Sequence, residues 1–332
     1  MADTQIRRSC ERATGRVYHC RTAGIGIDGS RWIGDVFQTE ETRQGMAILG
    51  VIGGSGFYDL EGLHEEETIE IDTPFGQPSA PPRRGTLGAT ELVFIARHGI
   101  GHGFSPTEVP YRANIHAFKQ LGVEQILSLS AVGSLRETLP PRSLVLPDQI
   151  IDRTVVRART YFEDGIVAHV GIADPFCARL QDAISAAAVA VGQPVHRGGA
   201  YVCIEGPQFS TRAESRLYRA WHATVIGMTA MPEARLAREA ELCYATLAMV
   251  TDYDVWHDSE ADVSVEVVLS NLEANSQAAA AILRSLAERG LPRRECACGS
   301  ALDYAIVTAP TRVSAAARQR VALLLRDRLP DA

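Results

Sequence analysis

The amino-acid sequence predicts an α/β fold in which a mixed, mainly parallel central sheet is flanked by helices. From Ala47 onward, short apolar runs alternate with segments whose apolar residues have helical spacing, and many runs end in glycine-rich or polar turns. Strands that alternate with helices build a largely parallel sheet, because each helix returns the chain across one face of it. A chain of 332 residues is long enough for one large domain with a substantial core.

The individual elements follow from the same patterns. Strands are predicted where the apolar runs are short, over residues 47–52, 87–96, 125–130, 195–204, 224–228 and 242–251. Helices are predicted over residues 111–121, 174–191, 212–221, 232–240 and 263–287. In the first helix Ile115, Phe118 and Leu121 have the spacing of one face, and Gly122 supplies a stop.

The chain divides into three parts. Residues 1–45 are rich in arginine and lack a sustained hydrophobic period, so we expect a flexible extension outside the core. Met46 directly precedes the first strand, and we expect the folded domain over residues 46–290. Pro292 marks a break, after which residues 291–332 are predicted to form a helical tail packed on this domain.

Composition and charge exclude several classes of protein. The net charge of −7 argues against a nucleic-acid binder, which needs a basic surplus to neutralise phosphates. No apolar run approaches the ~20 residues that span a bilayer, so we expect a cytoplasmic protein with no membrane partner. Seven scattered cysteines favour reduced, inert thiols over a disulfide framework. Cys296-Ala-Cys298 leaves a local link or a redox pair as the alternative.

Two predicted strands end in residues that suit an anion. Ser55 lies in the turn Gly53-Gly54-Ser55-Gly56, where backbone N–H groups and a hydroxyl can face a phosphate. A tight structural turn is the alternative, and the glycine spacing does not match a dinucleotide fingerprint. Arg97 and His98 follow the strand that ends at residue 96, and a guanidinium offers a rigid fork for phosphate oxygens.

Further donors end other strands, namely Ser130, Ala131 and Thr229. Since ligands of such sheets bind at the carboxyl ends of the strands, these groups are expected to converge on one anion site. His98 and His102 have the spacing of a helical metal pair, but the glycines around them disfavour a helix, and we predict no metal there.

Two carboxylates end the last predicted strand, in the segment Thr251-Asp252-Tyr253-Asp254. Alternation along an extended segment would point Asp252 and Asp254 to the same side. Neighbouring carboxylates resist joint ionisation, so one of them can hold the proton that a general acid needs. A solvated acidic turn is the alternative interpretation.

The ordered motifs resemble those of the methylthioadenosine phosphorylase family, within the trimeric purine nucleoside phosphorylase superfamily. The resemblance covers roughly residues 47–290 and implies a single-domain nucleoside phosphorylase fold. The matching segments occur in order as Gly53-Gly54-Ser55-Gly56, Thr73-Pro74-Phe75-Gly76, Ala96-Arg97-His98-Gly99, Ile204-Glu205-Gly206-Pro207, Gly227-Met228-Thr229, Met231-Pro232-Glu233 and Thr251-Asp252-Tyr253-Asp254.

The resemblance also implies roles for individual residues. The positions that match a phosphate site are Ser55, Arg97, His98, Ser130, Ala131 and Thr229. Those that match the nucleoside site are Met228 beneath the ribose, Phe209, Ser210, Asp252 and Asp254 around the purine, and Val265 and Val268 around the methylthio group. His169 matches a residue that a neighbouring subunit contributes, which implies a homotrimer. Gly227 departs from the asparagine of the animal enzymes.

The implied reaction is phosphorolysis of 5′-methylthioadenosine, with inorganic phosphate as co-substrate and no cofactor. Ser210, Asp252 and Asp254 favour a 6-aminopurine, since relatives that cleave 6-oxopurine nucleosides typically carry glutamate and asparagine there. A 6-oxopurine phosphorylase remains the first alternative. A non-catalytic nucleoside-binding protein and a nucleoside hydrolase are the others, and the set of phosphate-binding residues argues against both.

Overall fold

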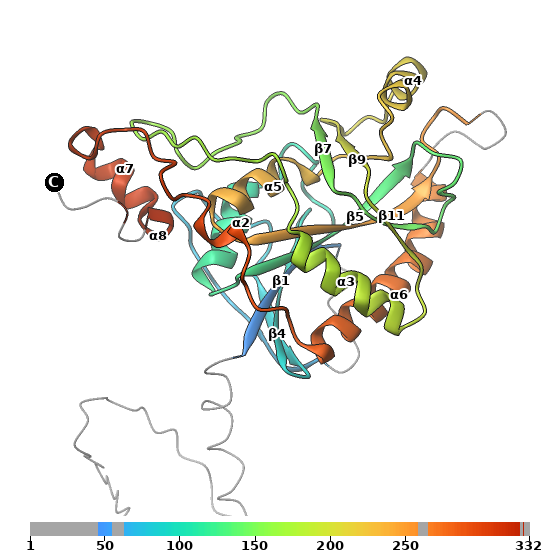
Figure 1. Cartoon of the computed structure of the whole chain (residues 1–332), viewed down its shortest axis with the longest axis horizontal. Helices are drawn as coiled ribbons and strands as arrows, with labels where there is room; N and C mark the ends of the chain where they lie inside the picture. The colour runs from blue at the N-terminus through green and yellow to red at the C-terminus, as the bar shows by residue number, and fades with distance from the viewer. Residues whose placement is uncertain (1–45, 55–62, 258–264, 326–327, 329–332) are drawn as a thin grey trace, which may run out of the picture. The chain divides into compact units, whose positions relative to one another are not determined.

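The structure is a computed structural model that describes residues 46–54, 63–257, 265–325 and 328 (Figure 1). These residues belong to one compact unit that begins at Met46. The extension predicted at residues 1–45 and the phosphate-site residue Ser55 lie outside the described part of the chain.

The central sheet is mixed and mainly parallel, as the sequence predicts. β1 pairs in parallel with β4 and β5, and β11 adds to β5 in parallel, whereas β3 and β10 run antiparallel to their neighbours β4 and β5. The sheet follows the order β2-β3-β4-β1-β5-β10-β9-β7, with β11, β6 and β8 branching from β5. The strands are β1 (Ala47–Gly53), β2 (His64–Thr68), β3 (Arg83–Leu87), β4 (Thr90–Ala96), β5 (Gln125–Ser134), β6 (Leu144–Leu146), β7 (Gln149–Asp152), β8 (Val195–Arg197), β9 (Ala200–Cys203), β10 (Val225–Gly227) and β11 (Cys243–Asp252).

Helices cover both faces of this sheet. Figure 1 shows α3 and α6 on one side of β5 and β11, and α2 and α5 on the other. A short helix, α4, stands apart from these two layers. The helices are α2 (Tyr111–Gln120), α3 (Ala178–Ala190), α4 (Arg212–Ala220), α5 (Ala230–Glu239) and α6 (Val265–Arg289).

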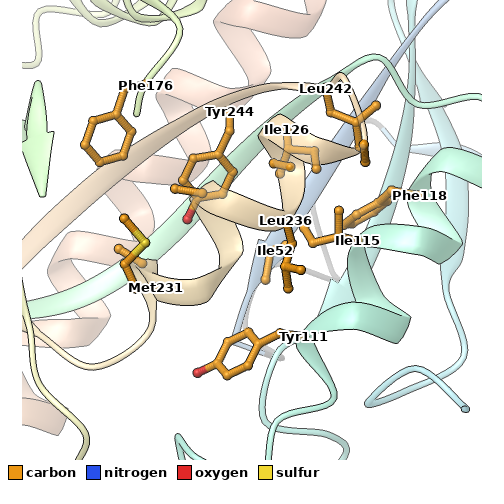
Figure 2. Packing of buried hydrophobic residues seen from close by; sticks show 14 of the residues in the cluster. Ile52, Tyr111, Ile115, Phe118, Ile126, Phe176, Met231, Leu236, Leu242 and Tyr244 are labelled. Atoms are coloured by element: carbon orange, nitrogen blue, oxygen red, sulfur yellow. The ribbon is translucent and has the colours of Figure 1, made fainter. Parts of the chain in front are cut away.

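The alternation of side chains along each strand creates a core on each face. On β11, Tyr244 and Val250 pack with α2 and α5, whereas Leu247 packs with α3 and α6. Figure 2 shows the first of these cores, in which Ile115 of α2 and Leu236 of α5 point towards the strands. Both cores exclude water from large aliphatic side chains, which is the main stabilising contribution to such a fold.

Two predicted strands are each interrupted by glycine. The pattern over 87–96 predicts one strand, but Gly88 has a φ of 60° and turns the chain from β3 into β4. The run over 195–204 is split into β8 and β9 by Gly198 and Gly199, whose φ values are 89° and 94°. A Cβ at Gly199 would lie 2.0 Å from Thr224 Oγ1, so close packing also requires glycine there.

Other boundaries differ by a few residues. The helix predicted over 174–191 begins only at Ala178, and the strand predicted over 125–130 continues to Ser134. The short strands β2, β6 and β7 carry too few residues for a period to be recognised in the sequence.

The C-terminal segment is a series of short helical pieces rather than a continuous helix. Val321, Leu324 and Leu325 are buried in the core that contains α2 and α5. Of the helices in the described part of the chain, none combines the length and apolarity needed to cross a membrane. The pieces are η2 (Ala297–Ser300), η3 (Pro310–Arg312), α7 (Ala315–Arg320) and α8 (Ala322–Leu325).

Candidate active site

A cavity of about 500 Å³ lies at the carboxyl ends of β1, β4, β5, β10 and β11. This is the edge of the sheet at which α/β proteins bind ligands. Most of the site residues predicted from the sequence line it, namely Arg97, His98, Ser130, Ala131, Phe209, Ser210, Met228, Thr229, Asp252 and Asp254.

Arg97 is held by a buried ion pair. Its Nε donates to Glu233 Oε1 at 2.6 Å, and its Nη2 donates to Ser128 Oγ and Glu233 Oε2. Nη1 donates to the Leu129 carbonyl at 2.9 Å. Four of the five guanidinium N–H groups are thus engaged by the described residues, and one on Nη1 is left for a ligand. The guanidinium fork that was predicted to bind phosphate oxygens is therefore occupied mainly by Glu233.

Glu233 keeps this arginine charged inside the protein. Burial alone would lower the pKa of Arg97, but the adjacent Glu233 carboxylate raises it above its ordinary value. Ser128 Oγ and Tyr244 Oη also donate to Glu233 Oε2, at 3.1 and 2.9 Å. The cation is fixed in position at the wall of the cavity, where it favours an anion.

His98 is neutral and fixed in one orientation. Burial, together with the charge of Arg97, lowers its pKa to about 4. Its Nδ1 lies 2.9 Å from the Phe104 carbonyl, so Nδ1 is the protonated nitrogen and Nε2 is an acceptor. Its ring stacks on that of His102 at a centroid distance of 4.3 Å. A neutral Nε2 can accept a hydrogen bond from a protonated phosphate oxygen.

Hydroxyl groups from two strands and from the start of α5 meet next to these side chains. Ser130 Oγ lies 3.1 Å from Tyr201 Oη and 3.4 Å from Thr229 Oγ1. Thr229 occupies the N-cap of α5 but makes no capping bond with its side chain. Its hydroxyl is therefore available to a ligand, at a helix end that favours anions.

Gly227 makes room for one of these hydroxyls. A Cβ at this position would lie 2.0 Å from Tyr201 Oη and 2.7 Å from Tyr201 Cζ. The tyrosine is fully buried and cannot move aside. Its ring thus fills the space that a side chain at 227 would take, which accounts for glycine at this position.

The two carboxylates are adjacent, but not through strand alternation. β11 ends at Asp252, and Asp254 lies in a turn with a φ of 53°. The Asp254 N–H donates to Asp252 Oδ1 at 2.8 Å, and Thr251 Oγ1 donates to Asp252 Oδ2 at 2.7 Å. The predicted proximity is present, and a turn produces it.

Burial makes both carboxyls easier to protonate. It raises the pKa of Asp252, and burial together with the charge of Asp252 raises the pKa of Asp254 to about 6. Asp254 Oδ2 and Ser210 Oγ are buried without a hydrogen-bond partner of good geometry among the described residues. Both residues line the cavity, so their side chains form part of the wall that a ligand would meet.

Arg157 organises the floor of the cavity, although the sequence pattern singled out no role for it. Its side chain is buried and donates to the carbonyls of Met228 and Met231 at 2.6 and 2.7 Å. It also pairs with Glu205 at 3.0 Å. Hydrogen bonds from Thr107 and two backbone N–H groups, aided by Arg157, lower the pKa of Glu205 to about 2 despite its partial burial. Met228 is therefore held from behind by charge-assisted bonds.

Four predicted residues are not placed in this cavity, and one of them, Ser55, lies outside the described residues. Val265 and Val268 belong to the first turns of α6, and their side chains lie outside the described part of the structure. The same helix lines the cavity with Leu272 and Ser276. His169 is exposed, and its N–H donates to the Ala305 carbonyl.

The sequence offered uneven signals for the residues that were missed. Glu233 stands within the motif Met231-Pro232-Glu233, and this motif was a signal in the sequence that the residue has a role. Arg157 and Tyr201 stand in no recognisable motif, and their contacts depend on segments far away in the chain.

Comparisons with known proteins agree with this geometry. Residues 48–288 match the phosphorylase superfamily. The chain is 51% identical over 279 residues to the S-methyl-5'-thioadenosine phosphorylase of Geobacter sulfurreducens, covering 84% of this chain and 98% of that protein. It is 50% identical to the enzyme of the same name from Koribacter versatilis, covering 84% of this chain and 96% of that one.

Solved structures show the same similarity. A methylthioadenosine phosphorylase from an antarctic soil metagenomic library superposes with a TM-score of 0.79 at 46% identity, covering 84% of this chain and 99% of that one. The methylthioadenosine phosphorylase of Schistosoma mansoni in complex with adenine gives a TM-score of 0.68 at 36% identity, covering 73% and 90%.

Proposed function

The chain belongs to the phosphorylase superfamily, and we propose that it catalyses the reversible phosphorolysis of S-methyl-5'-thioadenosine to adenine and 5-methylthio-α-D-ribose 1-phosphate. The products of this reaction enter purine and methionine salvage. One observation carries the proposal: a single cavity combines a fixed cation and hydroxyl donors with two carboxyls whose pKa values are raised.

Phosphate is proposed to bind through Arg97, His98, Ser130, the Ala131 backbone and Thr229, with Ser55 completing the site. A phosphate oxygen then forms a bond to C1′ of the ribose while the C1′–N9 bond breaks. The ribosyl ring gains positive charge as this bond lengthens, and the adjacent phosphate anion stabilises that charge. Holding both substrates together removes the entropic cost of their encounter from the barrier.

The departing purine takes the electron pair of the broken bond and needs a proton at N7. We assign Asp252 as the partner of N7 and Asp254 as the acceptor for the exocyclic 6-amino group. In support of the second role, Asp254 lines the cavity, and its carboxyl is buried next to Asp252. Phe209 and Ser210 would contact the base, Met228 the ribose, and Val265 and Val268 the methylthio group.

A 6-oxopurine nucleoside fits this arrangement less well. Its exocyclic oxygen would face the carboxylate of Asp254, and two opposed acceptors cost on the order of 1–3 kcal/mol. The relatives with about half of their residues identical are also named for methylthioadenosine. The reaction as written consumes phosphate as co-substrate and requires no further cofactor.

Product analysis tests the proposal. Incubation with methylthioadenosine should release adenine and a phosphorylated sugar only when phosphate is present. Asp252→Asn should lower the rate by ~10²–10⁴-fold, since the proton donor to N7 is removed. Base release without phosphate would show a hydrolase, and binding without turnover would show a non-catalytic protein. A preference for methylthioinosine would favour the 6-oxopurine alternative.

We further propose a homotrimer in which His169 reaches the methylthio end of a neighbour's cavity. In support, His169 is exposed and lies outside the cavity of its own chain. Exposed apolar side chains at Val155 and Val156 are also available for subunit contacts. Free thiols at the described cysteines support a reducing compartment such as the cytoplasm. Sedimentation of dilute enzyme tests the trimer, and a fully active monomer would contradict it.

A further inference from the structure

A second group of reactive side chains lies far from the cavity. Cys177, Cys243, Cys296 and Cys298 bring their sulfur atoms within 4.8 Å of one another, and we call them the four-cysteine cluster. All four are free thiols. The four cysteines come from three segments that are far apart in the sequence, and the fold brings these segments together.

The spacing of the sulfurs suits one metal ion. Cys296 Sγ lies 3.7 Å from Cys177 Sγ and 3.3 Å from Cys243 Sγ. Four thiolates bound tetrahedrally to zinc at about 2.3 Å would lie about 3.8 Å apart. Bonded sulfurs of a disulfide would lie much closer, at about 2.05 Å. We propose that the four-cysteine cluster binds a single zinc ion in a structural site.

The surroundings of the cluster suit a closed structural site. Cys177, Cys243 and Cys298 are buried within the core that contains α3 and α6, and Cys296 is partly buried against it. Cys177 is the N-cap of α3, at a helix end that favours negative charge. Four protein ligands leave no open coordination position for water or substrate, which is the arrangement of structural rather than catalytic zinc.

The position of the cluster separates it from the phosphorolysis chemistry. Cys243 begins β11 and Asp252 ends it nine residues later, which corresponds to about 30 Å of extended strand. Figure 1 shows the red segment after α6 returning to the start of β11. A metal here would join that segment to the start of β11 and to the start of α3. Its role would be to hold the C-terminal segment on the domain.

Metal analysis of the full chain tests the proposal. Protein made in zinc-supplemented medium and purified without chelators should contain about one zinc per chain. Replacement by cobalt should give the visible absorption of a tetrahedral cobalt–thiolate centre. The double variant Cys296→Ser/Cys298→Ser should lose both signals at least tenfold. Cys203→Ser is the matched control and should keep them, because Cys203 is buried elsewhere, beside Met231.

Several outcomes would overturn the zinc assignment. A wild-type chain without zinc, whose intact mass is lower by two hydrogens per cysteine pair, would show disulfides instead. Retention of iron in place of zinc would show a different metal, and zinc that survives in the double variant would place the metal elsewhere. If the double variant is insoluble, the metal content and cobalt spectrum of the wild type still decide.

Discussion

Position 227 is a glycine because the side chain of Tyr201 occupies the space that a larger residue would need. Tyr201 Oη lies where a Cβ would be placed, and the same hydroxyl contacts Ser130. The asparagine of the animal enzymes is thus incompatible with a tyrosine at 201. The two positions should behave as a coupled pair.

We therefore expect Gly227→Asn to lower the free energy of unfolding by about 1–3 kcal/mol, because the new side chain would clash with Tyr201. Tyr201→Val, combined with it, should recover part of that loss, because the smaller side chain vacates the space. Urea unfolding of both single variants and the double variant measures the coupling, which is expected at about 0.5–3 kcal/mol. Strictly additive effects would show that the clash is relieved elsewhere.

Asp254 illustrates a cost of the site to stability. Its pKa of about 6 in the folded protein exceeds the ~3.9 of an unfolded chain, so folding favours the protonated acid. The stabilising contribution is complete below about pH 4 and is lost as the pH rises through 6. Above that pH the protein carries a buried charge that an amide would not carry.

Asp254→Asn should accordingly raise the free energy of unfolding at about pH 8 by on the order of 1–3 kcal/mol, and give no gain near pH 4. Its activity should fall, because the proposed acceptor for the purine amino group is lost. Asp164→Asn is a matched control, since Asp164 also has a positive φ but its side chain is 75% exposed. A gain that is independent of pH would assign the effect to packing instead of charge.

At the scale of the elements, the Arg97–Glu233 ion pair joins the end of β4 to the start of α5. Both side chains are almost fully buried, so removal of one leaves the other charge without its partner. The arginine thus has a structural role and, in the proposed mechanism, a phosphate-binding role in the same place. A single substitution affects both.

Arg97→Ala should raise the KM for phosphate and also lower the free energy of unfolding by about 3–5 kcal/mol. The double variant Arg97→Met/Glu233→Gln removes both charges and should recover much of the stability, while the KM for phosphate stays raised. Urea unfolding and steady-state kinetics with phosphate varied separate the two effects. An unchanged KM in the double variant would exclude Arg97 from the phosphate site.

The sequence predicted best those elements whose evidence is local. β1, β5 and β11 were recognised because each is an apolar run followed by polar or glycine residues, and the cavity forms at those ends. The roles of Glu233, Arg157 and Tyr201 depend on contacts between distant segments, which no local pattern encodes. The four-cysteine cluster was missed for the same reason, as its three segments meet only in the folded sheet.

At the scale of the whole molecule, the match to the phosphorylase superfamily does not include the first 45 residues. The family match begins at residue 48, and 84% of this chain covers 98% of the Geobacter relative. Deletion of residues 1–45 should therefore leave kcat and the KM for both substrates within about twofold of the values for the full chain. A twofold change corresponds to a free-energy difference below about 0.5 kcal/mol. The truncated chain and the full chain can be compared by kinetics and thermal unfolding. Insoluble or inactive truncated protein would show that the segment belongs to the fold.

The proposed trimer makes a stricter demand, because each active site would need two subunits. His169→Ala should raise the KM for methylthioadenosine about tenfold, the equivalent of 1.4 kcal/mol, by removing a contact that a neighbour supplies. Asp252→Asn should lower the activity of its own cavity by ~10²–10⁴-fold, as argued above. In a mixed assembly, a His169→Ala chain supplies an intact cavity, and a neighbouring Asp252→Asn chain supplies an intact His169. The active site that these two chains form together contains neither substitution.

Co-expression of these two variants tests whether sites are shared. In a symmetric assembly with random mixing, roughly a quarter of the sites combine an intact cavity with an intact neighbour, so about that fraction of wild-type activity at low substrate should return. The separately purified variants, combined under conditions that prevent subunit exchange, provide the control. If the co-expressed chains are no more active than this control, His169 acts within its own subunit or not at all.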